Sequence, residues 1–577
     1  MIAASVVGTG NGTRNEVRVE GSVDSLTHLV DRLTAEVLAV GSVAARELRG
    51  RLAGVPLAAV RAWLDGQTAF RRTRYTDAVG HYAAALRSDS TFIPAVISGS
   101  VAVSWSQGAQ GSAEILTALL NAWRRRSELG TRDRILLTTL VSGAAFALPA
   151  GSVDLRAVWQ VVRDSAAMVA YDNADLLYLV ADEQFHFGPV RQPVSGAMAA
   201  ADADFSRILA LDSSYAGAYE HLVDLALLNG DTARARAHAT RYFALDSIAE
   251  HTDYIRWRLA AVDQNAPLRD SLRDRIGSMS FNNLGAIAGH GLALGLDARD
   301  VLAAAEAMER SASNPVEQQM AMFKRSGILV QRGQIDAALA APPFLGGILP
   351  AVAALIPSGV LAFENEPAAR RAAAATGTWL ATRAGSSPAE LIGRYWARCA
   401  LGTWHLSQQD LDRGERALAD LRRSASAAIG VAGLNTLGEP FCPALLEAWL
   451  AVQRRRPDAR RLVQHADSLM FSQGFEAGVI EATVVLARLW DTLGEPTAAL
   501  TAVRRVPIHP QVSLLYPLAV IAREEGRLAA LAGDREGAIR AYRRYLAIRV
   551  DPVERIKPEV ESVRKELARL ERESASK

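Results

Sequence analysis

The sequence predicts an all-α protein made of stacked helical hairpins, and three observations support that fold class. First, residues 66–90 carry a helical pattern of apolar side chains, and the segment before them, residues 60–70, also has helical composition. Second, the same pattern returns near the end of the chain. Third, 577 residues are too many for one ordinary core, whereas in a stack each hairpin buries its apolar face on the next. The apolar positions of the stretch 66–90 share one helical stripe; they are Tyr75, Ala78, Val79, Tyr82, Ala85 and Leu86.

The repeat is visible as a set of matching residues 460 positions apart. Gly533 and Asp534 supply the turn of the second copy, where Thr73 supplies that of the first. Another copy occupies residues 201–247, in which Asp212-Ser213 recurs as Asp246-Ser247 after 34 residues. Gly333 and Gly494 indicate degenerate copies. The matching residues are Gly66, Ala78, Val79, Tyr82 and Leu86 in the first copy, and Gly526, Ala538, Ile539, Tyr542 and Leu546 in the last.

These small and aromatic positions and the spacing of 34 residues resemble the tetratricopeptide repeat. The resemblance implies an α-solenoid, a right-handed superhelix of helical hairpins, whose inner helices bind a protein or peptide partner. We expect the Asp-Ser pairs to accept the free backbone N–H groups that open the next helix.

The chain divides into three predicted regions. Residues 1–50 contain a β-hairpin over 3–20, with Asn11-Gly12 as its turn, followed by a helix over 24–40. Residues 55–265 form a first array of hairpins, and residues 266–577 form a second, degenerate array. The chain ends in a charged capping helix over 552–577, with one apolar side; that side carries Val560, Val563, Leu567 and Leu570.

The first two regions carry a second resemblance. The run GTRNEVRVEGSVDSLTHLVDRLTAEVL, followed by PLAAVRAWLDGQTAFRRTRYTDAVGHYAAAL, is similar to a junction in bacterial serine/threonine kinases and related signalling regulators. There, the tail of a small TolB-like α/β domain runs into a tetratricopeptide array. Residues 1–50 would then be a remnant of that α/β domain. No Gly-rich loop, Val-Ala-Ile-Lys lysine or His-Arg-Asp loop of a kinase is present.

The charge balance argues against a polyanionic partner. Lys plus Arg is 64 and Asp plus Glu is 62, which leaves +2 and no strong field to attract nucleic acid. Only four residues are lysines, and none follows a glycine, so a phosphate-cradling Gly-Lys-Ser/Thr loop is absent. We therefore expect no nucleic acid partner.

One stretch is long enough to cross a membrane. Residues 337–363 carry no charge, but several prolines and glycines would break a spanning helix, so two short buried helices are the better prediction. The N-terminus lacks the cationic head and apolar run of a secretory signal. We therefore expect a cytoplasmic protein without a membrane span.

Cys399 and Cys442 are the two cysteines of the chain. They lie 43 residues apart in apolar helical surroundings, and buried thiols are favoured there over a disulfide or a redox pair.

The catalytic patterns tested do not fit. The chain has no Gly-x-Ser-x-Gly elbow, no His-Glu-x-x-His, no paired Cys-x-x-Cys and no calcium loop. Ser562 and Lys565 match Ser-x-x-Lys, but they lie in the charged terminal helix without companion motifs. The sequence predicts no enzyme, no cofactor and no metal site.

One constellation is a candidate binding site: Tyr178, Asp182, His186 and His221. Asp182 and His186 lie four apart on one helical face. The simpler interpretation is an i, i+4 ion pair or a cap that closes a helix at Gly188-Pro189; ligand contact and a metal site are the alternatives.

Two basic clusters, residues 124–126 and 454–456, allow phosphate or acidic peptide binding, but each is predicted to end a helix, where cations complement the helix dipole.

Three hypotheses remain. The first is a non-enzymatic scaffold or adaptor that binds a partner, such as a kinase or regulator, in bacterial signalling. The second is the sensory half of a serine/threonine kinase or transcriptional regulator whose effector domain is missing from this chain. The third is an enzyme built within the helical array.

Overall fold

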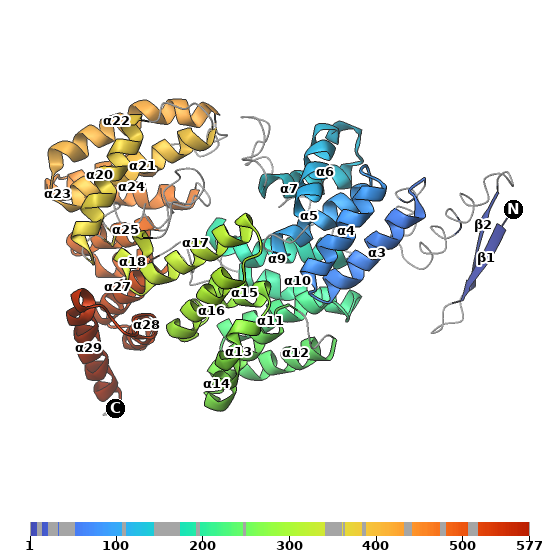
Figure 1. The fold of residues 1–577 in the computed structure, drawn as a ribbon. Coiled ribbons are helices and arrows are strands. Elements are labelled where there is room, and N and C mark those ends of the chain that lie inside the picture. The colour runs from blue at the N-terminus through green and yellow to red at the C-terminus, as the bar shows by residue number, and fades with distance from the viewer. Residues whose placement is uncertain are drawn as a thin grey trace. The chain divides into compact units, whose positions relative to one another are not determined.

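Where the computed structural model describes this chain, its regular structure is helical apart from one β-hairpin near the N-terminus (Figure 1). The all-α prediction is confirmed. The structure describes residues 2–7, 14–20, 54–106, 111–143, 174–191, 197–245, 250–340, 364–382, 388–431, 441–472, 481–505 and 517–575, with residues 33, 52, 360 and 361. The predicted helix over 24–40, except residue 33, and most of the uncharged stretch 337–363 lie outside these residues.

The N-terminal hairpin pairs β1 (Ile2–Val7) with β2 (Arg14–Val19) as antiparallel strands. Ile2 faces Val19 and Val7 faces Arg14 across the pair. This confirms the hairpin predicted over residues 3–20.

The helices group into two compact units. The first unit comprises residues 1–147, 155–182 and 200–252, and the second comprises 148–154, 183–199 and 253–577. The boundary therefore falls within one helix, α9, directly after Asp182. The helices that contribute to the first unit are α3 (Leu57–Arg71), α4 (Tyr75–Ser88), α5 (Ile93–Ser106), α6 (Ser112–Arg124), α7 (Thr131–Gly143), α9 (Ala174–Arg191), α10 (Ala197–Leu211), α11 (Ala216–Leu228) and α12 (Thr232–Leu245).

The hairpin α3–α4 is the repeat unit that the sequence predicts. Thr73 turns the chain between the two helices with a φ of 56°. Ala78 and Tyr82 of α4 are fully buried against α3. A Cβ atom on Gly66 of α3 would lie only 2.5 Å from Tyr82 Cε1, so the glycine is what lets the two helices approach. The recurring spacing of glycine and tyrosine in the pattern therefore reflects one contact, in which Gly66 packs against the ring of Tyr82.

The last repeat has the same construction. Gly526 of α27 (Leu518–Leu531) faces Tyr542 of α28 (Arg535–Ile548), and an added Cβ would lie 2.4 Å from its ring. Gly533, with a φ of 80°, makes the turn, and Asp534 Oδ1 accepts a hydrogen bond from the Gly537 N–H. Packing, turn and cap thus explain why these residues recur 460 positions apart.

In the first unit, residues of its first hairpin contact residues near its end. Thr73 Oγ1 lies 2.7 Å from the Tyr242 hydroxyl, across 169 positions of sequence. The Thr76 N–H donates to Glu250 Oε1 at 2.7 Å. The Phe70 ring meets Tyr178 edge-on, with 5.9 Å between centroids. An open solenoid joins neighbouring repeats only, so these long-range contacts are a feature that the repeat pattern did not predict.

The second unit holds a longer series of hairpins, several of which turn at a glycine with positive φ, including Gly333 and Gly494 at 77° each. Both positions confirm predicted repeats. Its helices, besides part of α9 and of α10, are α13 (Thr252–Val262), α14 (Ala266–Asp274), α15 (Phe281–His290), α16 (Ala298–Ser311), α17 (Pro315–Gln331), α18 (Ile335–Leu339), α20 (Glu366–Thr382), α21 (Pro388–Ser407), α22 (Leu411–Val431), α23 (Phe441–Gln453), α24 (Ala459–Ser472), α25 (Glu481–Thr492), α26 (Pro496–Arg504), α27, α28 and α29 (Lys557–Ala575).

Long-range ion pairs also close the second unit. The guanidinium group of Arg299, in α16, donates two hydrogen bonds of 2.6 and 2.7 Å to the carboxylate of Asp551, which lies just after α28. Arg549 pairs with Glu364, and both side chains are almost fully buried. Gln331 Oε1 accepts from the Ala519 N–H at 3.3 Å. The start and end of this array are therefore held together.

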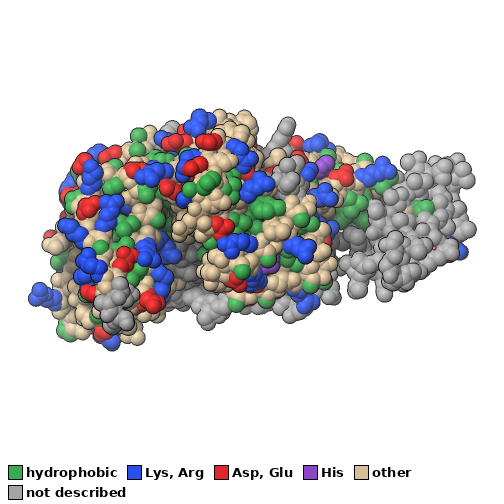
Figure 2. Space-filling view, turned by 90° about the horizontal axis from the view of Figure 1, so that it is seen from below, with side chains coloured by type: hydrophobic (Ala, Val, Ile, Leu, Met, Phe, Trp, Pro, Cys, Tyr) green, Lys and Arg blue, Asp and Glu red, His purple; other side chains and the backbone are tan. Residues whose placement is uncertain are grey.

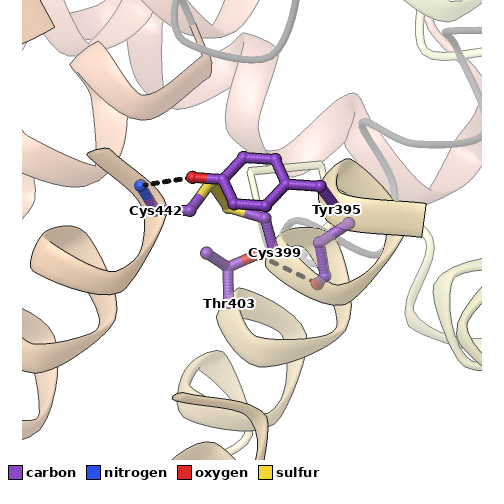
Figure 3. Close-up of a disulfide and its surroundings, with 5 residues drawn as sticks. Tyr395, Cys399, Thr403 and Cys442 are labelled. Atoms are coloured by element: carbon purple, nitrogen blue, oxygen red, sulfur yellow. Dashed lines mark hydrogen bonds between the residues drawn. A yellow bond between two sulfur atoms is a disulfide. The ribbon is translucent and has the colours of Figure 1, made fainter. Parts of the chain in front are cut away.

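The two cysteines form a disulfide, with 5.8 Å between the Cα atoms of Cys399 and Cys442 (Figure 3). The prediction of two buried thiols is wrong, although their burial is confirmed at 7% and 0% exposure. The reason is tertiary: α21 and α23 are packed together, which brings two residues 43 apart in sequence within bonding distance.

Other local predictions have mixed outcomes. The terminal helix α29 buries its predicted apolar side, and the two basic clusters lie at the ends of α6 and α23, as predicted.

The Asp-Ser pairs act differently from the prediction. Asp89 and Asp212 each accept a hydrogen bond of 2.9 Å from the backbone N–H two residues later, and so stabilise the turn rather than the start of the next helix. Helix α9 continues past Gly188-Pro189 to Arg191, so the predicted end there is wrong.

Within the described residues, no helix is both long and apolar enough to cross a membrane. Basic and acidic side chains are interspersed on the face drawn in Figure 2, in keeping with the small net charge of +2.

Candidate binding site

Three of the four predicted site residues meet inside the first unit. Tyr178 and Asp182 lie one turn apart on α9, and His221 reaches them from α11. The rings of Tyr178 and His221 meet edge-on, with 5.7 Å between centroids. His186 lies beyond the unit boundary, so we describe it with the second unit.

Asp182 and His221 form a buried pair. His221 Nε2 lies 3.2 Å from Asp182 Oδ1, and its Nδ1 lies 2.8 Å from the Gly217 carbonyl oxygen one turn earlier in α11. Burial alone lowers the pKa of His221, but the hydrogen bond and charge of Asp182, together with Glu220, outweigh it and raise the pKa. The imidazolium form, with an acceptor at each nitrogen, is therefore favoured.

A second pair, absent from the prediction, lies beside the first. His251 Nδ1 is 2.6 Å from Glu220 Oε1, and both side chains are buried. Burial lowers the pKa of His251 as well, and the charge and hydrogen bond of Glu220 again raise it overall. Glu220 and His221 are consecutive in α11, so this helix contributes one group to each pair. We call these four residues the paired histidines and carboxylates.

Trp105, at the end of α5, covers both histidines. Its ring stacks on Tyr75 with 5.1 Å between centroids, and lies 5.4 Å from the His221 ring and 6.0 Å from the His251 ring. Trp105 is half-buried, whereas the residues beneath it are buried. Sequence analysis missed Trp105, Glu220 and His251 as site residues. Glu220 precedes the predicted site residue His221 directly, but nothing in the sequence places His251 opposite Glu220.

Buried polar atoms accompany this cluster. Among the described residues, the Oε2 atom of Glu220 is buried without a hydrogen-bond partner, and the buried hydroxyls of Tyr75 and Tyr178 interact with each other. Burial raises the pKa of both tyrosines well above the usual value, so both hydroxyls stay protonated. A Cβ on Gly217 would lie 2.8 Å from the Tyr178 hydroxyl, so the glycine is needed to make room for it.

This arrangement favours binding of a partner by side chains that are already held in place. Each histidine is held by a carboxylate, so side-chain positions and charges are fixed before any ligand arrives. Two groups of the cluster remain partly open to solvent: the half-buried Trp105 and the Asp182 side chain, which is 20% exposed. Indole and carboxylate together can contact an apolar and a cationic or hydrogen-bond-donating group of a partner.

His186, in the second unit, is 5% exposed. Its ring meets Phe185 edge-on at 4.9 Å and lies 6.3 Å from the ring of His290 in α15. Asp182, His186 and His221 are all side chains that metals use as ligands. The boundary between the units separates His186 from the other two, so a metal centre is not part of the function proposed below.

No protein-family model matches the chain, and no curated protein matches it. Among solved structures, the chain is similar to the tetratricopeptide domain of P58(IPK), with 12% sequence identity and a TM-score of 0.19. The match covers 70% of this chain and 99% of that domain.

Proposed function

We propose that this chain is a non-enzymatic interaction protein and that a protein or peptide partner binds the first unit at Trp105 and Asp182. The observation that carries the proposal is the convergence of α5, α9 and α11 on one polar and aromatic cluster, in which Trp105 and Asp182 are partly open to solvent.

The energetics of recognition favour such a cluster. Binding energy in protein interfaces concentrates in a few aromatic and charged residues that are held in place by buried neighbours. Trp105 rests on the buried Tyr75, and Asp182 is fixed by His221. Ordering these two side chains therefore costs little when a partner arrives, because their conformations are already restricted.

The hypothesis also names the kind of partner. The junction between the first two predicted regions resembles that of kinase-linked arrays, which makes a bacterial kinase or regulator the partner to test first. A role in bacterial signalling, either as a separate adaptor or as the sensory part of a longer regulator, is proposed on that resemblance alone.

The test is a calorimetric titration of the purified chain with candidate kinases and regulators encoded beside its gene. We expect Trp105→Ala to weaken binding of the partner at least about tenfold, which corresponds to about 1.4 kcal/mol. Trp63→Ala is the matched control, since Trp63 is also a half-buried tryptophan of the first unit but contacts Phe92 and Ser98 instead.

A second pair of variants tests the carboxylate. Asp182→Asn should weaken binding, whereas Asp202→Asn should not, although Asp202 is similarly exposed and also paired, with Arg234 on α12. Equal effects of each variant and its control would contradict this site. Turnover of a substrate by the purified chain, abolished by Asp182→Ala, would overturn the non-enzymatic proposal itself.

A further inference from the structure

The disulfide between Cys399 and Cys442 bears on where this protein folds. It links α21 to α23, the first helices of two successive hairpins, α21–α22 and α23–α24. Figure 3 shows the bond between the two helices with the Tyr395 ring beside it. The Cys442 N–H donates to the Tyr395 hydroxyl at 3.4 Å. Both cysteines of the chain are used, so no thiol remains to exchange with the bond.

We infer that the second unit folds and works in an oxidising compartment outside the cytoplasm. Structural disulfides persist in such compartments, while cytoplasmic reductants keep thiols reduced. This inference departs from the cytoplasmic location expected from the sequence, and it rests on the tertiary placement of the two cysteines. A kinase or regulator that binds this chain would then have to present its binding part outside the cytoplasm.

Burial argues against the alternative of a cytoplasmic redox switch. Regulatory disulfides are exposed or strained, so that a thiolate can reach a sulfur atom. Here Cys399 is 7% exposed and Cys442 is 0% exposed, and Tyr395, whose ring lies beside the bond in Figure 3, is 6% exposed. Little of either cysteine is therefore open to a reductant while the unit stays folded.

The bond forms by oxidation of two thiols during folding. A disulfide-carrying oxidoreductase of the compartment accepts the two electrons and two protons, and its own disulfide becomes a dithiol. One of the two thiols, as the thiolate, attacks the disulfide of the oxidant and forms a mixed disulfide. The other cysteine then displaces the oxidoreductase and closes the bond between Cys399 and Cys442.

The test traps the redox state of the full chain in cells that make it naturally. The cells are quenched with acid, free thiols are capped with N-ethylmaleimide, and the denatured protein is then reduced and treated with a polyethylene glycol maleimide. We expect both cysteines to resist capping and to react only after reduction, so the protein shifts on a gel by two additions. The double variant Cys399→Ala/Cys442→Ala should show no shift.

Capping of both thiols before reduction would overturn the inference, as would a bond that appears only after the cells are treated with an oxidant. Because the decisive measurement uses the unmodified chain, it stands even if the double variant does not fold. A second measurement uses purified chain: reductant alone should leave the folded protein oxidised, and reductant with denaturant should open the bond. Rapid opening in the folded protein would contradict the argument from burial.

Discussion

The contact between Gly66 and Tyr82 allows the repeat packing to be tested with a single methyl group. Gly66→Ala adds a Cβ that would lie 2.5 Å from Tyr82 Cε1 and 2.7 Å from Cδ1, whereas ordinary contacts start near 3.4 Å. Tyr82 is 0% exposed, so its ring cannot move aside without disturbing neighbours. Gly80→Ala, in the same hairpin, is the matched control, since its Cβ would meet nothing within 4 Å.

The magnitude follows from the difference between these two variants. Each replaces a helical glycine with alanine and so gains about 0.5–1 kcal/mol of backbone stability, which cancels in the comparison. Overpacking remains for Gly66→Ala alone and costs about 1–3 kcal/mol. We therefore expect Gly66→Ala to be less stable than Gly80→Ala by about 1–3 kcal/mol. Gly526→Ala, against Tyr542, should repeat the result in the second unit, with Gly377→Ala as its control.

The assay is urea denaturation followed by circular dichroism of the helices. Equal stability of Gly66→Ala and Gly80→Ala would refute the packing argument. A second arm isolates the contact: in a Tyr82→Leu background the cost of Gly66→Ala should largely disappear, because the ring that the methyl group meets is gone. A cost that stays unchanged in that background would show that the strain lies elsewhere in the hairpin.

Three further predictions follow from the same structure. Ala78→Trp should lower the midpoint of thermal unfolding through overpacking of about 1–3 kcal/mol or more, because Ala78 is 0% exposed; an unchanged midpoint would mean that the helix faces are assigned wrongly. The raised pKa values of His221 and His251 stabilise the folded protein at pH values below the unfolded histidine pKa, and this contribution is lost as pH rises through the folded pKa values. The free energy of unfolding should therefore fall with rising pH across that range, and less steeply in His221→Gln and His251→Gln; a slope equal to that of the unmodified chain would contradict the pairing. Cys399→Ala/Cys442→Ala should lose up to about 4 kcal/mol in unfolding experiments without reductant, as expected for a closed loop of 43 residues, and no loss would show that the bond does not constrain the unfolded chain.

The repeat pattern was readable from the sequence because it is local. Gly66, Thr73, Ala78 and Tyr82 report the turn and the buried side of one hairpin, and the structure confirms each of them. The terminal helix was predictable for the same reason. Even the candidate cluster was partly visible, since Tyr178 and Asp182 share a helical face and do meet His221.

The contacts between distant repeats were not readable. His251 contacts Glu220, and Thr73 contacts Tyr242, because residues far apart in sequence pack together within the first unit. Trp105 gave no signal as a site residue, because a tryptophan at the end of a helix is equally suited to a core. The extension of α9 beyond Gly188-Pro189 shows that helix-ending residues act as a preference, which surrounding structure can override.

The sequence by itself determined that this protein is an array of helical hairpins, since residues spaced along one helix encode which side is buried and where the chain turns. Only the tertiary structure decided which repeats meet across each unit, that Cys399 and Cys442 are bonded, and that two histidines face two carboxylates beneath Trp105. The physical reason is that helical periodicity specifies a buried face but not its partner, which is selected by packing among residues far apart in the chain.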